Sequence, residues 1–439
     1  MSRIPYQIVR LAKGGQGITY YNEKVFFTAG ALPGESGQAE VISEKSRFGR
    51  CRAVTCDKPS PLRNQNDACP ISGQCDSCGF RHAKPEFALK LKAEALSSEI
   101  FKIAHLDPIE PSYYAVSAPT GSLDGLRQRV RLHLAWGKIG YFARDSHTIV
   151  PAVQCTVIDP VLANIVRQLN ENKPPTPHFS CDLQIDLDDN RQPFLHIRPT
   201  ESEISGRGPK KFTKPAVWLH QIIQSGLFKG IRFGDEHIAG DAMIRDTVSI
   251  PSHPDIHYWR RIGDFAQATG QGNAHLHQIV ADFLRQTKPH AVADLFSGSG
   301  NLTFRAAQFV PEVHAFEFYC DPDAFNRGIE DNRQTWLQNT RVDMQLCDLT
   351  KGLPQTAANC DAAICDPARE GLSEKMCYDL KTSRIRHILY ISCEATNLAR
   401  DLARLKSCFE LSSLGFVDMF PQTPHVETVA SLVREHSDT

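Results

Sequence analysis

The sequence lacks three features that would each assign it to a special class of protein. It contains no run of about 18 apolar residues, the length that a membrane-spanning helix requires. Residues 1–7 do not include the apolar core of a secretory signal peptide. The chain also carries no internal repeat and no low-complexity segment. We therefore expect a cytoplasmic protein that is not associated with a membrane.

An excess of charge of either sign is also absent. The 49 Lys and Arg residues and the 50 Asp and Glu residues give a formal net charge of −1. Any affinity for nucleic acid therefore has to come from local patches of charge. The 14 cysteines are spread over a long chain. Metal binding, catalysis or burial explains them better than a disulfide scaffold does.

The length predicts several domains. A chain of 439 residues is too long for one ordinary domain. We predict three parts, 1–58, 59–255 and 256–439, with segment 85–120 packing on either the central or the C-terminal part. A monomer is the expected oligomeric state.

The first part alternates short β-like runs with glycine turns. This spacing predicts a small barrel of the oligonucleotide-binding type, although another small β-barrel fits the pattern equally well. The central part is predicted to be β-rich. In it, alternation places Arg127, Arg129 and Arg131 on one strand face. That face is either an ordinary solvated surface or a stripe that contacts RNA phosphates.

From about residue 264 the pattern changes to alternating strands and helices. Residues 274–285 and 302–309 are predicted helices. The predicted strands cover residues 291–296, 313–316, 362–365 and 388–391. This alternation predicts a Rossmann-like α/β domain with a parallel sheet.

A glycine-bearing loop follows the first of these strands. Residues 293–301, ADLFSGSGN, read as a strand end, a loop and a helix start. Glycine lets the backbone approach a ligand closely, although many such loops are plain turns. The third glycine of the dinucleotide fingerprint is missing, which favours S-adenosylmethionine over NAD. The loop residues predicted to contact the cofactor are Phe296, Ser297, Gly298 and Gly300.

Three carboxylates extend this predicted site. Glu317 ends the next strand, where a carboxylate can hold ribose hydroxyls. Asp348 lies where an adenine amino group could be bound. Asp366 follows strand 362–365 and can face both cofactor and substrate, although Asp-Pro pairs also simply form turns.

A cysteine follows the last predicted parallel strand. Residues 388–391 deliver Cys393 to the carboxyl end of the sheet, where reacting groups collect. Farther along, Glu427 adds a carboxylate. A thiol, a cofactor loop and a carboxylate together suggest covalent chemistry on an electrophilic ring. The alternative for Cys393 is a buried structural cysteine.

With these residues in order, the chain resembles the RNA uracil-5-methyltransferase family over nearly its whole length. The family motifs are Asp-Pro-Pro-Arg-x-Gly, Ser-Cys-Asn-Pro-x-Thr-Leu-x-Arg-Asp and Pro-His-x-Glu. The residues that match them are Asp366, Pro367, Arg369, Gly371, Ser392, Cys393, Leu398, Arg400, Asp401, Pro424, His425 and Glu427. Gln267 resembles a glutamine that lies beside the cofactor in this family. Ala368 and the stretch from Glu394 to Asn397 depart from the motifs.

The resemblance implies an enzyme that uses S-adenosylmethionine to form 5-methyluridine in RNA. Carbon 5 of uracil is a poor nucleophile, and a thiolate that adds to carbon 6 activates it. Cys393 is the implied nucleophile, and Glu427 the base that removes the proton from carbon 5. The ordinary thiol pKa is about 8.5, so the site is expected to lower it. Glu394 would oppose this if its carboxylate pointed inward.

The layout is most similar to members that act on 23S ribosomal RNA. Residues 8–18 and 27–35 also resemble a TRAM domain, an RNA-binding barrel. The target uracil has to leave its stack, which favours a loop or an unfolded RNA segment. The alternatives are transfer RNA as substrate, a different target base such as cytosine, and a catalytically silent RNA-binding homologue.

Cys69, Cys75 and Cys78 form a Cys-x5-Cys-x2-Cys array, and Cys155 is the candidate fourth ligand. Four thiolates suit either zinc or an iron–sulfur cluster. The array resembles the cluster of some family members, which implies a [4Fe-4S] cluster with a structural role.

Overall fold

The computed structural model describes residues 2–75, 77–117, 122–144, 146–172, 180–199 and 216–435. The chain divides into two compact units that each gather distant segments. Unit 1 comprises Met1–Ala68, Cys78–Val116 and Leu349–Thr439, and unit 2 comprises Cys69–Ser77 and Ser117–Asp348. Each unit combines segments from more than one of the three predicted parts. The boundaries of these parts remain predictions.

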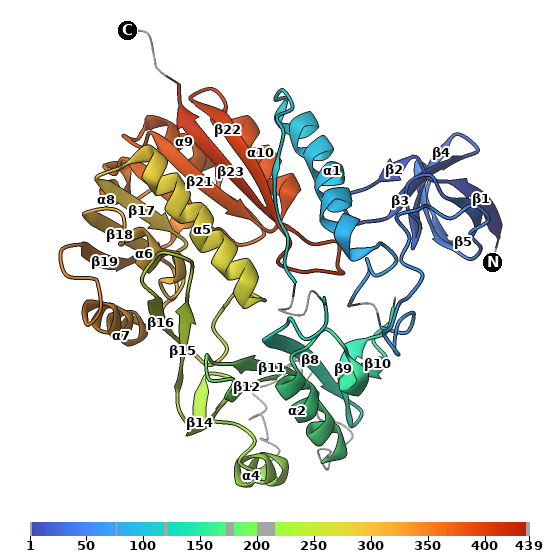
Figure 1. Ribbon diagram of the computed structural model, residues 1–439, viewed down its shortest axis with the longest axis horizontal. Coiled ribbons are helices and arrows are strands. Elements are labelled where there is room, and N and C mark those ends of the chain that lie inside the picture. Colours follow the sequence, from blue (N-terminus) through green and yellow to red (C-terminus); the bar gives the residue numbers. More distant parts are fainter. Residues whose placement is uncertain are drawn as a thin grey trace, which may run out of the picture. The chain divides into compact units, whose positions relative to one another are not determined.

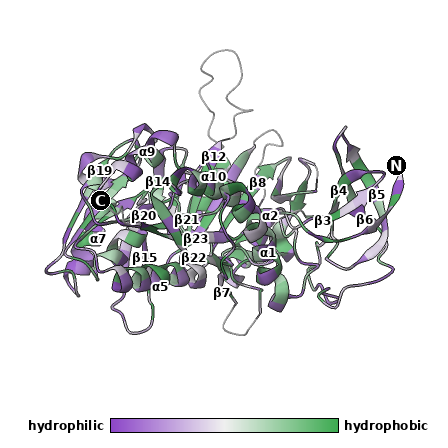
Figure 2. Ribbon diagram, turned by 90° about the horizontal axis from the view of Figure 1, so that it is seen from above, coloured by the Kyte–Doolittle hydropathy of each residue, from purple (hydrophilic) through white to green (hydrophobic). Residues whose placement is uncertain are grey.

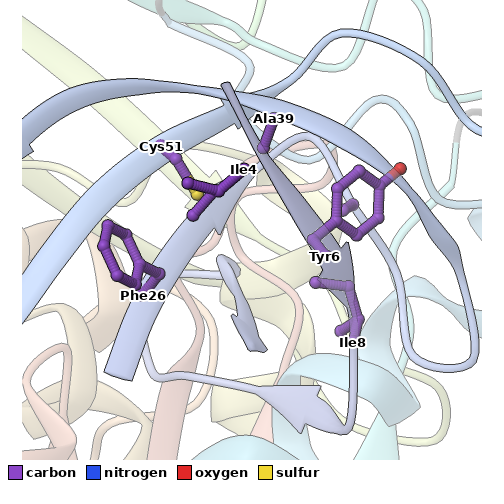
Figure 3. Packing of buried hydrophobic residues seen from close by; sticks show 7 residues of the cluster. Ile4, Tyr6, Ile8, Phe26, Ala39 and Cys51 are labelled. Carbon is purple, nitrogen blue, oxygen red and sulfur yellow. The ribbon is translucent and has the colours of Figure 1, made fainter. Parts of the chain in front are cut away.

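The N-terminal strands of unit 1 form one curled sheet (Figure 1). They are β1 (Arg3–Gln7), β2 (Arg10–Leu11), β3 (Gly17–Tyr21), β4 (Lys24–Ala29), β5 (Ser36–Glu44) and β6 (Phe48–Ala53), in the order β1-β5-β6-β4-β3-β2. Alternate residues of β1, Ile4 and Tyr6, point inward and pack with Ile8, Phe26 and Cys51 (Figure 3). The predicted OB-like barrel is confirmed.

Unit 1 also contains five neighbouring strands of an eight-stranded sheet, in the order β20-β21-β23-β22-β7. Its strands are β7 (Ser112–Tyr114), β20 (Ala362–Cys365), β21 (His387–Ser392), β22 (Phe409–Val417) and β23 (Glu427–Arg434). The helices of this region are η2 (Leu349–Lys351), α8 (Gln355–Ala358), α9 (Glu374–Thr382) and α10 (Ala395–Leu405). Nearly every residue of β20 and β21 is buried, and Figure 2 shows hydrophobic residues along β21. Strands β20 and β21 are parallel, as predicted, whereas β23 runs antiparallel to β21.

Helix α1 (Pro85–Ala104) packs beside α10 in unit 1 (Figure 1). The helix begins with a proline, whose missing N–H is not needed in the first turn. At its other end, Lys406 donates to the carbonyl of Ala104 at 3.2 Å. Of the two places considered for segment 85–120, the structure therefore puts this helix with the C-terminal sheet.

A buried ion pair fixes α1 to the segment that leads into β23. The Lys92 ammonium lies 2.5 Å from the Asp418 carboxylate and donates to the carbonyl of Thr423 at 3.1 Å. Burial lowers the pKa of Lys92 and raises that of Asp418, so desolvation outweighs the attraction for both groups. The pair thus adds little net stability, but loss of one partner leaves a buried charge alone.

We expect Lys92→Met to lower the free energy of unfolding by about 3 kcal/mol, because Asp418 is left unpaired. The midpoint of denaturant unfolding measures this. Lys90→Met on the exposed face of the same helix is the matched control and should change little. Adding Asp418→Asn to Lys92→Met should recover most of the loss. Equal midpoints for the Lys92 and Lys90 variants would contradict the prediction.

The central sheet of unit 2 has the order β10-β9-β8-β11-β12-β13-β14. Its strands are β8 (Arg129–Ala135), β9 (Lys138–Phe142), β10 (Ile149–Pro151), β11 (Cys181–Leu187), β12 (Pro193–Pro199), β13 (Gly230–Phe233) and β14 (Glu236–Gly240). The accompanying helices are η1 (Ala152–Gln154), α2 (Pro160–Glu171) and α4 (Ala216–Gln224). The predicted β-rich character of this region is therefore present.

The rest of unit 2 contains a hairpin, β15 (Met243–Val248) and β16 (Ile256–Arg261), followed by alternating helices and strands. These are α5 (Gly270–Thr287), β17 (Ala291–Leu295), α6 (Asn301–Ala306), β18 (Glu312–Glu317), α7 (Pro322–Arg333) and β19 (Arg341–Leu346). The order β19-β18-β17 with parallel pairing confirms the Rossmann-like prediction. In the part of the chain that the structure describes, no helix combines the length and apolarity needed to cross a bilayer.

Candidate active site

Strand register in unit 1 brings Cys393 and Glu427 together. Ser392, the last residue of β21, pairs with Thr428 of the antiparallel strand β23. Cys393 directly follows Ser392, and Glu427 directly precedes Thr428. The antiparallel pairing therefore places the thiol beside the carboxylate. The sequence suggested both residues but not this register.

Asp366 joins them from the neighbouring parallel strand. It follows β20, whose last residue Cys365 pairs with Tyr390 of β21. Burial and the charge of Glu427 raise the pKa of Asp366 well above its usual range. Burial also raises the pKa of Glu427, to about 7. The charge of Glu427 therefore disfavours the ionised form of Asp366.

The thiol pKa differs from the sequence prediction. Burial, Glu427 and Asp366 raise the pKa of Cys393 to about 11, whereas a lowered value was expected. The expectation is wrong for the protein alone, because the carboxyl neighbours penalise a thiolate. Arg369 opposes the rise. This residue was quoted as part of a motif, but the sequence analysis gave it no role.

Glu394 does not point toward the thiol. It is the N-cap of α10, where its carboxylate accepts from the backbone N–H of Thr396 at 3.3 Å. The same carboxylate forms an ion pair with Lys13 of the barrel. The thiol pKa is shifted by burial, by Glu427, Arg369 and Asp366 and by the backbone of Cys393 itself, and Glu394 is not among these causes. The departure from the family motif at this position therefore adds no carboxylate to the groups that shift the thiol pKa.

A cavity of about 570 Å³ opens in front of Cys393 within unit 1. Residues 393–395 and 424–426 form one wall, the barrel forms a second and α1 forms a third. Basic and aromatic side chains line it, namely Arg10, Lys13, Tyr20, Phe27, Lys102 and His425. Such a lining suits a nucleic-acid segment, because cations meet phosphates and rings meet bases.

The glycine loop in unit 2 has the backbone that the sequence suggested. Gly298 and Gly300 adopt φ values of 55° and 92°, and Phe296 adopts 65°. A side chain at Gly298 would enter open space, whereas one at Gly300 would strike Phe304 and Phe325. Gly298 therefore leaves room for a ligand, and Gly300 permits close packing of α6. Ser297 is buried behind the loop, with its N–H donating to the carbonyl of Phe316.

Glu317 and Asp348 lie at neighbouring strand ends. The Glu317 carboxylate accepts from the N–H of Gly298 at 3.0 Å and so ties the end of β18 to the loop. The charges of both acids add to burial in raising the pKa of Cys347. Gly298, Ser299 and Glu317 contribute to a cavity of about 750 Å³. Of the predicted cofactor residues, only Asp366 belongs to unit 1.

Asn301 is a residue that the sequence analysis passed over. Its amide exchanges two hydrogen bonds with the amide of Asn273, at 3.0 and 2.8 Å. Its oxygen also lies 2.9 Å from Nε2 of His277, whose pKa burial lowers to about 3. These contacts fix the start of α6 to α5. A polar residue directly after the glycine loop was the available signal.

The arginine stripe needs correction at Arg129. Its guanidinium is 2.8 Å from Asp186, which lies opposite it on β11, and it donates to the carbonyl of Ala266 at 2.7 Å. The side chain is only 15% exposed, so Arg129 is an internal support for the segment that carries Gln267. The alternation of side chains along the strand correctly placed these arginines on one face, but Asp182 and Asp186 of the adjacent strand β11 lie on that face and pair with Arg131 and Arg129. Arg131 pairs with Asp182 and stays half exposed. Arg127 and Arg131 remain predictions as RNA contacts.

The structure brings part of the cysteine array together. Cys75 and Cys155 both belong to unit 2, and Cys75 is close enough to add to burial in raising the pKa of Cys155. The turn that carries Cys69 closes through a hydrogen bond from the Ser72 N–H to the Cys69 carbonyl. Cys78 falls in unit 1. Among the described residues, no three His, Cys, Asp or Glu side chains are grouped to hold a metal ion.

Comparison with known proteins shows where this chain has relatives. The family model described as tRNA (Uracil-5-)-methyltransferase matches residues 234–435. A Pseudomonas fluorescens protein named 23S rRNA (uracil(1939)-C(5))-methyltransferase is 30% identical, with 96% of this chain and 92% of that protein covered. A Vibrio cholerae protein of the same name is 26% identical over 98% of this chain and 96% of its own length.

A solved structure shares the fold. The Pyrococcus abyssi tRNA (uracil-54, C5)-methyltransferase, in complex with S-adenosyl-L-homocysteine, superposes with a TM-score of 0.69 and 19% identity. The match covers 98% of this chain and all of that one. The predicted fold, a class I methyltransferase domain with an N-terminal barrel and a central β-rich region, is confirmed.

Proposed function

Since the chain belongs to the RNA uracil-C5 methyltransferase family, we propose that it forms 5-methyluridine in RNA, with 23S ribosomal RNA as its substrate. One observation carries the proposal from family to active enzyme: the β21–β23 register places Cys393 beside Glu427 in a buried site. A silent homologue would have no need of this pair. The rRNA assignment follows the names of the two bacterial relatives. It implies that the protein acts in the cytoplasm. We propose a monomer as the functional form.

We assign two chemical tasks to this pair. The Cys393 sulfur adds to carbon 6 of uracil, which makes carbon 5 nucleophilic. After carbon 5 is methylated, Glu427 removes its proton, and elimination releases Cys393. Arg369 favours the thiolate by opposing the rise in its pKa. Asp366 lies at the end of β20, where burial and the charge of Glu427 raise its pKa.

The residues of the glycine loop fit S-adenosylmethionine. Gly298 leaves open space, and Glu317 presents a carboxylate at the strand end next to it. Gln267 follows Ala266, which Arg129 fixes. We propose that these residues hold the cofactor together with Phe296, Ser297, Gly300, Asp348 and Asp366. When bound, S-adenosylmethionine supplies an electrophilic methyl group and a positive charge.

Glu427 gives the reaction a defined pH dependence. A base acts only when ionised, and a carboxyl whose pKa is about 7 loses that form as pH falls. We therefore expect kcat to decrease as the pH is lowered, and below about pH 6 the decrease should approach tenfold per pH unit. Initial rates at saturating RNA and methyl donor between pH 5.5 and 9 measure this. A kcat that stays constant between pH 5.5 and 7 would remove Glu427 from the rate-limiting proton transfer.

Nucleoside mass spectrometry tests the function itself. Ribosomal and transfer RNA from cells with and without the gene would be digested and compared. Loss of 5-methyluridine from ribosomal RNA supports the proposal, whereas loss from transfer RNA alone would favour the tRNA alternative. Loss of 5-methylcytosine would indicate the other pyrimidine. If neither pool changes, the silent RNA-binding alternative gains support.

We further propose a [4Fe-4S] cluster on Cys69, Cys75, Cys78 and Cys155, with zinc as the rival. The proximity of Cys75 and Cys155 supports it, because these two thiols come from segments far apart in the sequence. The ligand set suits a structural cluster near the RNA path. We expect anaerobically purified protein to contain iron and sulfide, and Cys155→Ser to lose most of both. Zinc without iron or sulfide in that preparation would defeat the assignment.

The barrel completes the proposal. We assign it as a TRAM-like RNA-binding domain, supported by its curled sheet and by the basic and aromatic residues it contributes to the cavity before Cys393. Arg127 and Arg131 are further candidates for phosphate contacts.

A further inference from the structure

A polar network joins the barrel to the residues that follow the nucleophile. Lys13 lies in the turn between β2 and β3, and its ammonium donates to the Glu394 carboxylate and, at 2.6 Å, to the Thr396 hydroxyl. That hydroxyl donates to Glu99 of α1 at 2.9 Å. Three segments that are far apart in the sequence, the barrel, α1 and the start of α10, thus meet within unit 1.

The network fixes the backbone on both sides of Glu394. Its carboxylate accepts from the N–H of Thr396, and its own N–H donates to the Ser392 hydroxyl at 3.1 Å. Cys393 lies between these two anchored residues. A cap of this kind holds the first turn of a helix, and here it also holds the turn that presents the thiol.

The charges of the network balance only in part. The ammonium of Lys13 pairs directly with Glu394, whereas Glu99 is connected to it only through the hydroxyl of Thr396. Glu394 is about three-quarters buried, so water compensates its charge poorly. Without Lys13, the Glu394 carboxylate would no longer be held away from Cys393, whose surroundings already contain Glu427 and Asp366.

We propose that Lys13 is a positioning residue for the reaction, which holds the turn around Cys393 through Glu394, so that the barrel supports the nucleophile as well as binding RNA. The inference rests on the proposed function. The Glu394 side chain, where the family motif has asparagine, is then a partner for the barrel rather than a defect in the motif.

A simpler role for Lys13 is contact with an RNA phosphate, because it lines the cavity before Cys393. The two roles predict different kinetics. A phosphate contact contributes to binding, so its loss raises KM for RNA and leaves kcat unchanged. A positioning residue acts on the chemical step, so its loss lowers kcat.

The kinetic test uses Lys13→Met, Glu394→Gln and their combination in the full chain. Glutamine keeps the oxygen that caps α10 but removes the charge. We expect K13M to lower kcat about tenfold with KM for RNA within about twofold, and the double variant to recover most of kcat. Lys102→Met, in the same cavity, is the matched control and should change KM for RNA instead. A raised KM without a change in kcat for K13M would overturn the proposal.

A second measurement does not depend on methyl transfer. The rate at which iodoacetamide alkylates Cys393 is followed by peptide mass spectrometry, with the exposed Cys56 as internal reference. We expect K13M to slow alkylation of Cys393 about threefold, because a Glu394 carboxylate no longer held by Lys13 can turn toward the sulfur and disfavour the thiolate, and we expect the double variant to restore the rate. Simple loosening of the fold would expose the thiol and speed the reaction. An unchanged or faster rate overturns the proposal, and this result can be read even if no RNA is methylated.

Discussion

Cys393→Ala should abolish methyl transfer, with a decrease in kcat of at least about 10³-fold, while folding and cofactor binding survive. The physical reason is that carbon 5 of uracil does not attack a methyl sulfonium unless a nucleophile first adds to carbon 6. Among the described residues that line the cavity, Cys393 is the one that carries a thiol, and it directly follows β21. The measurement is transfer of a radioactive methyl group to RNA, with calorimetry of S-adenosylhomocysteine binding in parallel.

The matched control for this variant is Cys408→Ala. Cys408 follows α10 in the same unit and is not among the residues that line the cavity. It should retain activity close to that of the unaltered protein. Methyl transfer by Cys393→Ala at more than a few per cent of the control rate would remove the thiol from the mechanism. Loss of both activity and cofactor binding would instead show that the substitution had damaged the fold.

Glu427→Gln should trap a covalent complex between the protein and RNA. Glutamine has nearly the shape of glutamate but cannot accept the proton from carbon 5, so elimination stalls and Cys393 stays bonded to carbon 6. We expect steady-state turnover to fall about 10²–10⁴-fold while a denaturation-resistant band of protein and RNA accumulates. Gel electrophoresis under denaturing conditions, with labelled RNA and methyl donor, measures the adduct.

Glu410→Gln provides the comparison for this variant. Glu410 is an exposed residue of β22, the strand next to β23, and its loss should leave turnover unchanged and give no adduct. The double variant Cys393→Ala, Glu427→Gln should also give no adduct, because the bond requires the sulfur. Rapid turnover by Glu427→Gln without an adduct would refute the assignment of the base.

The pairing of β21 with β23 shows what the local sequence could predict and what it could not. The apolar run of β21 and the motif around Cys393 predicted a thiol at a strand end, and the structure has it there. The partner strand could not be inferred in the same way. Glu427 begins a strand that runs antiparallel to β21, and only that pairing places its carboxylate beside the sulfur.

The protonation of the site was misjudged for a related reason. The motif suggested an activated thiol with a lowered pKa, but burial among Glu427 and Asp366 raises it to about 11 in the protein alone. Ionisation depends on every charge within a few ångströms, whichever part of the chain supplies it. The same holds for Arg129, which the strand pattern offered to RNA and which Asp186 and a backbone carbonyl hold inside.

The amino-acid sequence by itself predicted the alternation of strands and helices in the C-terminal part, the glycine loop, and Cys393 and Glu427 as candidate nucleophile and base, because apolar periodicity and short motifs are local properties. The tertiary structure alone decided which distant groups meet. It turned Glu394 toward Lys13, away from the nucleophile, and it surrounded the thiol with carboxyl groups. These outcomes depend on contacts between residues up to hundreds of positions apart, and no local pattern records such contacts.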